Sequence, residues 1–200
     1  MISPSAWFVY CHVHGHKDPN FAGMSRFRAR YSVARSEITL DIHEVGEETN
    51  AAYLELFQLF LAYSALDTFE QVTKKPGRTV IQDSECARLM RGRYLEDFTK
   101  PLALSLSGKS KKRHMQNAEK FLSGESEDLR VFIYALRNLF CHGALTAARL
   151  DLTNSKKKRQ LVRALSEAVL LASEIQFQKY VDSWSIQQTG NSVRRYFEDN

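Results

Sequence analysis

The sequence predicts a mainly α-helical protein with a small β element at its N-terminus. Apolar residues recur at helical spacing through most of residues 46–186. A strict alternation of apolar and polar residues is confined to the first 45 residues. We therefore expect a bundle of about five helices over residues 46–186, a β-containing extension over 1–45 and a polar C-terminal tail over 187–200.

The composition bounds the class of protein. A chain of 200 residues suffices for one domain with a sizeable core. Its net charge of +5 is compatible with a nucleic-acid partner. The three cysteines Cys11, Cys86 and Cys141 show no C-x-x-C spacing, which argues for a reducing compartment and against a disulfide or zinc framework. Without a signal peptide or an uninterrupted apolar span, we expect a soluble cytoplasmic protein and no membrane association.

The N-terminal extension contains the alternating segments. Residues 6–14 predict a strand, and two shorter runs, 27–33 and 38–42, are also β-like. On such a strand His12, His14 and the following His16 would share a face and could meet one metal ion. The pattern is equally typical of a polar strand edge that runs into a turn, so both interpretations stay open.

Residues 51–73 are apolar on most faces and predict a central helix. Asp67 and Glu70 lie on or beside its apolar stripe, where a carboxylate without a partner is costly. We expect both acids to support a site by pairing with Arg137 or His142. The alternative is that they simply reach water near the helix end.

Further helices are predicted over residues 83–99, in a short segment that ends near 122, and over 155–184. Basic clusters lead into the second and open the third: Lys109, Lys111, Lys112 and Arg113, and Lys156, Lys157, Lys158 and Arg159. Positive charge at a helix N-terminus opposes the macrodipole, which favours an anionic partner such as RNA phosphates. A solvated charge run is the alternative for each cluster.

The helix predicted between Ser126 and Gly143 carries the candidate chemistry. Ser126 is the expected N-cap, and Gly143 is the expected residue after the last turn. Large apolar side chains at helical spacing form its core face: Leu129, Phe132, Ile133, Leu136, Leu139 and Phe140. The opposite sector is polar and small-apolar: Arg130, Val131, Tyr134, Ala135, Asn138, Cys141 and His142. Because that sector is half apolar, we expect a partner to cover it.

Arg137, Asn138 and His142 lie within six residues of one another at the end of this helix. Asn138 and His142 are i,i+4 neighbours and can act together. Arg137 and His142 diverge by about 140° on an ideal helix. They can therefore meet on one phosphate only if the helix ends near Cys141, or if a second copy of the helix packs alongside.

The pattern Arg137-Asn138-x-x-x-His142-Gly143, late in an amphipathic helix of a small helical chain, resembles the signature of the HEPN superfamily. The likeness covers residues 48–184. It implies a helical homodimer whose motif helices form one cleft, and in many members a metal-independent endoribonuclease without a cofactor. A toxin or antiviral defence role, with an antitoxin partner, would fit the family. Ala144 departs from a subgroup that has a tyrosine there, which a nucleotidyltransferase antitoxin modifies.

The motif residues suit RNA cleavage by the 2′-OH. His142 could take or give a proton near neutral pH, and Arg137 could hold the phosphate bidentately. Asn138 could orient the histidine, with Tyr134 as a supporting residue. The resemblance implies one histidine as base and its twin as acid, giving a 2′,3′-cyclic phosphate and a 5′-hydroxyl. The alternatives are an inactive RNA- or nucleotide-binding domain and a protein-interaction subunit.

Overall fold

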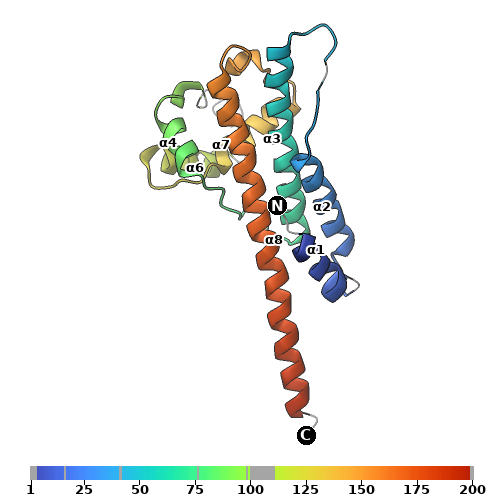
Figure 1. Cartoon of the computed structure of the whole chain (residues 1–200). Coiled ribbons are helices and arrows are strands. Elements are labelled where there is room, and N and C mark those ends of the chain that lie inside the picture. The colour runs from blue at the N-terminus through green and yellow to red at the C-terminus, as the bar shows by residue number, and fades with distance from the viewer. Residues whose placement is uncertain are drawn as a thin grey trace.

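The computed structural model describes residues 4–15, 17–40, 42–75, 77–97, 99 and 111–198, without the side chains of 4, 5, 13, 14, 111–113 and 184–198. The described part confirms the mainly α-helical class (Figure 1). Its elements are α1 (Pro4–Val9), the π-helix η1 (Tyr10–Gly15), α2 (Phe21–Arg35), α3 (Glu47–Val72), α4 (Ser84–Arg91), α6 (Lys111–Ser123), α7 (Arg130–Cys141), the 3₁₀-helix η2 (Ala148–Leu150) and α8 (Lys156–Glu198).

Helix α3 is the central element, as its apolar sequence predicts. Glu47 and Glu48 lie in its first turn, where acidic side chains favour a helix start. It packs against α2, α7 and α8. The ring of Phe69 on α3 contacts that of Tyr180 on α8. Earlier along both helices, Glu55 of α3 pairs with Arg163 of α8. Because the earlier residue of α3 meets the earlier residue of α8, and the later meets the later, α3 and α8 run parallel, as Figure 1 shows.

The predicted strands at residues 6–14 and 27–33 are wrong, because both segments are helical. Aromatic packing against the bundle explains the first difference. The rings of Trp7 and Tyr10 lie 5.9 and 5.7 Å from that of Phe177 on α8. Tertiary packing of this kind overrides the β preference of aromatic residues. Residues 37–40 and 42 form no regular element either.

The N-terminal helices belong to the same core as the rest of the bundle. Phe27 of α2 is fully buried and lies 5.1 Å from the ring of Phe69. Gly23 allows this approach, because a Cβ at that position would come within 2.4 Å of Val72 Cγ2. Buried Asp18 accepts hydrogen bonds of 2.7 Å from Tyr10 and Tyr180, which ties the N-terminal segment to α8.

Helix α8 differs from its prediction at the C-terminal end. We expected the helix to stop near residue 184 and a polar tail to follow from 187. Its backbone instead stays helical to Glu198 and projects beyond the other helices (Figure 1). Within the described ranges, no helix has the combined length and apolarity needed to cross a bilayer.

Candidate functional site

The two ends of α7 compare differently with their predictions. The expected N-cap Ser126 lies outside the helix, which begins at Arg130 with Leu129 in the cap position. Asp128 supports the start instead, because its Oδ1 accepts the Arg130 N–H at 3.0 Å. At the other end the prediction is confirmed, since α7 stops at Cys141 and Gly143 follows with a φ of +67°.

Three contacts define how α7 lies on α3. In order along α7, Arg130 meets Glu70, Tyr134 meets Tyr63, and Arg137 meets Phe60. Since the partners on α3 run backwards, the two helices are antiparallel. The C-terminal end of α7 therefore lies at the end of the bundle where α3 and α8 begin.

The outward sector of α7 is only partly open, which corrects our expectation for two of its residues. Val131 and Ala135 are 4% and 1% exposed, so they are buried inside the monomer. Tyr134 is half-buried, and its ring is stacked on that of His114 at 4.9 Å with 7° between the planes. Helix α6 thus lies against this side of α7, and the open part is the last turn, with exposed His142.

Arg137 is half-buried and held from two sides. Its Nη1 donates a 2.9 Å hydrogen bond to Asn138 Oδ1, and its Cζ lies 5.8 Å from the centre of the Phe60 ring. Its Nε is buried and has no hydrogen-bond partner within the described part of the chain. An arginine offers five N–H donors, so this guanidinium is positioned while part of its donor capacity stays unused.

His142 is the C-cap residue of α7 and its side chain is exposed. Its backbone N–H donates to Asn138 O at 3.0 Å, so the last turn links the histidine to the asparagine directly. The structure therefore brings Arg137, Asn138 and His142 to one exposed helix end. Among the described side chains Arg137 and Asn138 are hydrogen-bonded to each other, and His142 contacts them only through its backbone N–H.

Glu70 does not support that end. Its carboxylate is 1% exposed and pairs with Arg130 at 2.5 and 2.7 Å. It also accepts the backbone N–H groups of Gly77 and Thr79 at 2.8 and 3.0 Å. Burial alone would raise the Glu70 pKa, but these bonds and the charge of Arg130 hold the pKa below its ordinary value of 4.5. The predicted pairing of Glu70 with Arg137 or His142 is wrong.

The role of Arg130 as the partner of Glu70 was not predicted from the sequence. Arg130 lies seven residues before Arg137, which on an ideal helix is about 10 Å along the axis and within about 20° of the same direction. That spacing puts Arg130 on the same side of α7 as Arg137, but only the antiparallel placement of α7 on α3 shows that Arg130 is the arginine that reaches Glu70.

Asp67 is not brought to the motif either. It accepts a 2.9 Å hydrogen bond from Gln71, one turn further along α3. Among the described side chains it forms no ion pair with Arg137 or His142, so that expected pairing is wrong. Tyr134 does lie one turn before Arg137, between Tyr63 and His114.

Part of the first basic cluster lies at the start of α6, and the second cluster opens α8. Lys109 lies outside the described residues. Lys111, Lys112 and Arg113 form the first turn of α6, directly before His114, and their side chains lie outside the description. The start of α6 is thereby placed next to Tyr134 of α7.

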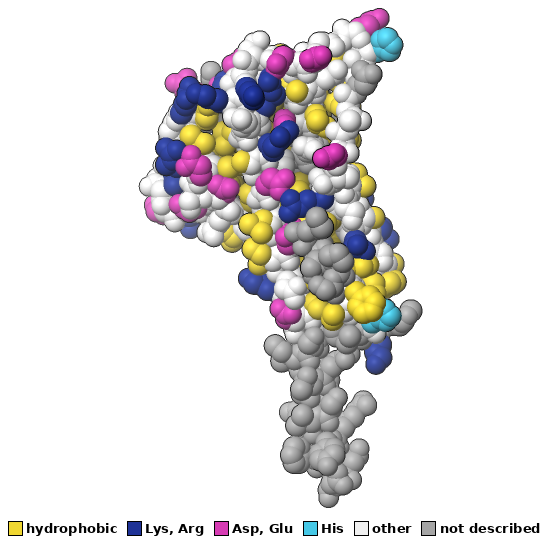
Figure 2. Space-filling model, in the orientation of Figure 1, with side chains coloured by type: hydrophobic (Ala, Val, Ile, Leu, Met, Phe, Trp, Pro, Cys, Tyr) yellow, Lys and Arg dark blue, Asp and Glu magenta, His cyan; other side chains and the backbone are white. Residues whose placement is uncertain are grey.

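In the cluster at the start of α8, two of the four basic residues form ion pairs within the chain. Lys156 and Lys157 are exposed. Lys158 pairs with Asp97 and Asp151 at 3.1 and 3.2 Å, while Arg159 pairs with Glu48. Figure 2 shows acidic side chains intermixed with the basic ones at this end of the molecule.

The proposed histidine cluster loses its geometric basis. His12 and His14 belong to η1, and residues two apart on a helix do not face the same way. His16 lies outside the described residues. The shared strand face that motivated the metal interpretation is therefore not present.

Comparisons with models of protein families, with curated proteins and with solved structures found no match for this chain.

Proposed function

We propose that the chain is a metal-independent endoribonuclease of the HEPN type, with its site at the C-terminal end of α7. The observation that carries the proposal is the arrangement of three side chains. Arg137 and Asn138 are hydrogen-bonded beside Phe60, and His142 is exposed one turn later. A held cation and an accessible imidazole at the same helix end are suited to phosphodiester chemistry once a second copy completes the site.

The end point of α7 supports this assignment. Helix α7 stops at Cys141, but the His142 N–H still donates to Asn138 O. His142 therefore keeps its helical position and its divergence from Arg137; in this proposal a second copy brings the two groups to one phosphate. His142 takes a C-cap conformation with φ of −88° and ψ of 7°, and Gly143 then turns the chain away. The imidazole is thus free of a following helical turn and accessible to a substrate phosphate.

The reaction we propose uses the nucleophile that RNA carries. His142 of one copy takes the proton from the 2′-OH, and the 2′-oxygen forms a bond to phosphorus. The bond between phosphorus and the 5′-oxygen breaks, and His142 of the second copy protonates that oxygen. Arg137 stabilises the negative charge on the phosphate oxygens. The products are a 2′,3′-cyclic phosphate and a 5′-hydroxyl.

Two basic segments could hold the flanking phosphates. The first turn of α6, with Lys111, Lys112 and Arg113, begins next to Tyr134. Exposed Lys156 opens α8 at the same end of the bundle as His142. In this proposal Lys158 and Arg159 contribute less, because acidic partners already hold them.

The surface next to the motif supports a second copy as the completing partner. Phe57 and Phe60 on α3 are only half-buried and lie with ring centres 6.3 Å apart. Arg137 of α7 contacts Phe60, and Cys141, one turn after Arg137, is exposed. A patch that is apolar in its centre and carries a cation at its edge is typical of a protein interface.

Cleavage of RNA in EDTA tests the nuclease. The natural protein should cut, and His142→Ala and Arg137→Ala should each lose at least about a hundredfold in rate. His43→Ala and Arg78→Ala are controls of the same residue types, because both residues are exposed and neither belongs to α7. RNA that stays intact with the natural protein would overturn the nuclease. Salt-dependent binding that survives His142→Ala would then favour the non-catalytic RNA-binding alternative.

Cross-linking through Cys141 tests the second copy. The thiol is exposed and directly precedes His142. If two α7 ends meet in a dimer, a short bis-maleimide should join the chains through Cys141. Cys141→Ser should abolish the cross-linked dimer and Cys11→Ser should leave it. A dimer in solution that never cross-links at Cys141 would show that the copies meet elsewhere.

A further inference from the structure

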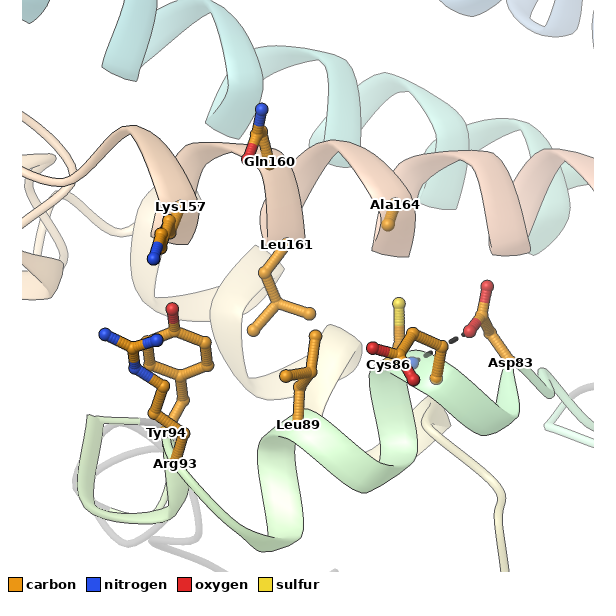
Figure 3. A pocket seen from close by; sticks show the side chains of 10 residues that line it. Asp83, Cys86, Leu89, Arg93, Tyr94, Lys157, Gln160, Leu161 and Ala164 are labelled. Carbon is orange, nitrogen blue, oxygen red and sulfur yellow. Dashed lines mark hydrogen bonds between the residues drawn. The ribbon is translucent and has the colours of Figure 1, made fainter.

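A groove between α4 and the start of α8 forms a second site, separate from the motif helix. It has a volume of about 350 Å³, within the range of small-molecule pockets. Leu89 on α4 and Leu161 and Ala164 on α8 line its middle, as Figure 3 shows. The groove is apolar in its centre and carries charged side chains at its two ends.

The end next to the start of α8 is cationic. Arg93 and Lys157 are both exposed there, and the Arg93 guanidinium lies 5.5 Å from the centre of the Tyr94 ring. Figure 3 shows the Tyr94 hydroxyl pointing toward α8 on the Lys157 side. Neither Arg93 nor Lys157 forms an ion pair with any side chain in the described ranges. Two cations and a phenol hydroxyl therefore face the groove with unused donor capacity.

The other end carries acids that are already engaged. Asp83 caps α4 by accepting the Cys86 N–H at 2.8 Å, and Glu85 pairs with Arg88 on the helix surface. Burial raises the pKa of the Cys86 thiol to about 12, with Asp83 adding to the effect, so the thiol is a neutral part of the wall. Glu85 is balanced by Arg88 and Asp83 is held at the N-terminus of α4, so the positive charge of the groove lies at the opposite end, at Arg93 and Lys157.

We propose that this groove binds an amphipathic carboxylate, with the anionic head at Arg93 and Lys157 and the chain along Leu89, Leu161 and Ala164. The positions of Lys157 and Ala164 set the length of the chain. They are seven residues apart on α8, which is about 10 Å. In an extended zigzag chain each carbon–carbon bond of about 1.5 Å advances about 1.3 Å, so eight carbons extend about 9 Å and, with the carboxylate oxygens, match that distance.

The proposal explains why two cations stay unpaired over an apolar surface. An apolar chain alone would gain burial but leave the cations without a partner. A small anion alone would be held only by exposed charges, which is weak. A ligand with both parts uses both features, so head and chain should each be required for binding.

Titration calorimetry of the full-length chain with octanoate tests the site. Octanoate should bind with a dissociation constant on the order of 100 μM, while acetate and octanamide should bind at least about tenfold more weakly. Lys157→Gln should weaken octanoate binding about fivefold. Lys156→Gln is the matched control, because it removes the same charge one residue earlier, outside the groove lining.

A second variant tests the chain-binding part. Ala164→Trp should fill the middle of the groove and abolish octanoate binding, with helical content checked by circular dichroism. If that variant does not fold, the comparison of Lys157→Gln with Lys156→Gln still decides, because both residues are exposed. Absence of octanoate binding, equal binding of octanamide, or equal effects of the two lysine variants would each overturn the proposal. None of these readouts depends on RNA cleavage.

Discussion

Two arginines two turns apart on α7 face the same helix and play different parts. Arg130 donates to both oxygens of buried Glu70 and to the Thr79 carbonyl at 2.9 Å. Arg137 donates to Asn138 and lies against Phe60, while its buried Nε has no hydrogen-bond partner among the described residues. The first guanidinium is satisfied by a carboxylate, and the second is held without one.

In our proposal, this difference separates a structural cation, Arg130, from one that meets a ligand, Arg137. A buried charge without a counter-charge is costly, so a chain rarely keeps one without a use. At Arg137 the cost is limited by partial exposure and by the aromatic ring. The available cation lies next to the exposed end of the helix, and the satisfied one lies deeper along α3. This contrast is what our proposed function depends on.

The largest expected effect comes from breaking the satisfied pair. Arg130→Met should lower the free energy of unfolding by roughly 3 kcal/mol, because it leaves the Glu70 carboxylate buried without its partner. Arg137→Met should lower the free energy of unfolding by less than about 1 kcal/mol, because no carboxylate loses its partner when Arg137 is removed. Urea unfolding followed by circular dichroism measures both. Equal losses would show that the two arginines are structurally equivalent.

A double substitution sharpens that comparison. Arg130→Met combined with Glu70→Leu should be more stable than Arg130→Met alone, because no unpaired charge is then buried. The exposed pair Glu85–Arg88 gives a reference for a surface contact, and its removal should change stability little. A double variant as unstable as the single one would show that Arg130 acts through packing rather than through the ion pair.

Exchange of arginine for lysine should lower the RNA cleavage rate at position 137 and the stability at position 130. Arg137→Lys keeps the charge but loses the bidentate fork, so RNA cleavage should fall by about tenfold or more with little change in stability. Arg130→Lys should lower stability and leave the cleavage rate per folded molecule unchanged. Cleavage of a short labelled RNA, normalised to folded fraction, measures this. A larger rate loss from Arg130→Lys would reverse the assignment.

Acid should reveal the Glu70–Arg130 pair. The Glu70 pKa is lowered from 4.5, because the bonds from Arg130, Gly77 and Thr79 outweigh the effect of burial. A carboxyl with a lowered folded-state pKa adds stability above its unfolded-state pKa, and this stability is lost as the pH falls through the folded-state pKa. The free energy of unfolding should therefore drop below about pH 4.5. Glu70→Gln should show a shallower drop, and an unchanged one would contradict the assigned pKa.

The sequence was informative where a local signal decides the structure. The central helix, the end of α7 and the left-handed Gly143 follow from periodicity and from the conformational freedom of glycine. The N-terminal helices did not follow, because the alternation of residues 6–14 is compatible with a strand in isolation. Contacts of Trp7 and Tyr10 with a residue of α8 far along the chain decide the outcome there.

The candidate site shows the same division. That Arg137, Asn138 and His142 share a helix end could be predicted, because they are close in sequence. Which acid meets which arginine could not, since Asp67 and Glu70 lie on another helix and their partners depend on how α3 and α7 are placed. Glu70 pairs with Arg130, which lies two helical turns before Arg137 on α7.

The smallest expected effect concerns the basic residues at the start of α8 and extends the same distinction between satisfied and available cations. Lys156 is exposed, whereas Lys158 is held by Asp97 and Asp151. Lys156→Gln should weaken RNA binding about twofold to fivefold and lower the salt dependence by about one phosphate contact. Lys158→Gln should leave the salt dependence unchanged, because its charge is already balanced. Fluorescence anisotropy over a range of salt concentrations measures both slopes, and equal slopes for the two variants would mean that ion pairing does not decide which cations of this chain meet RNA.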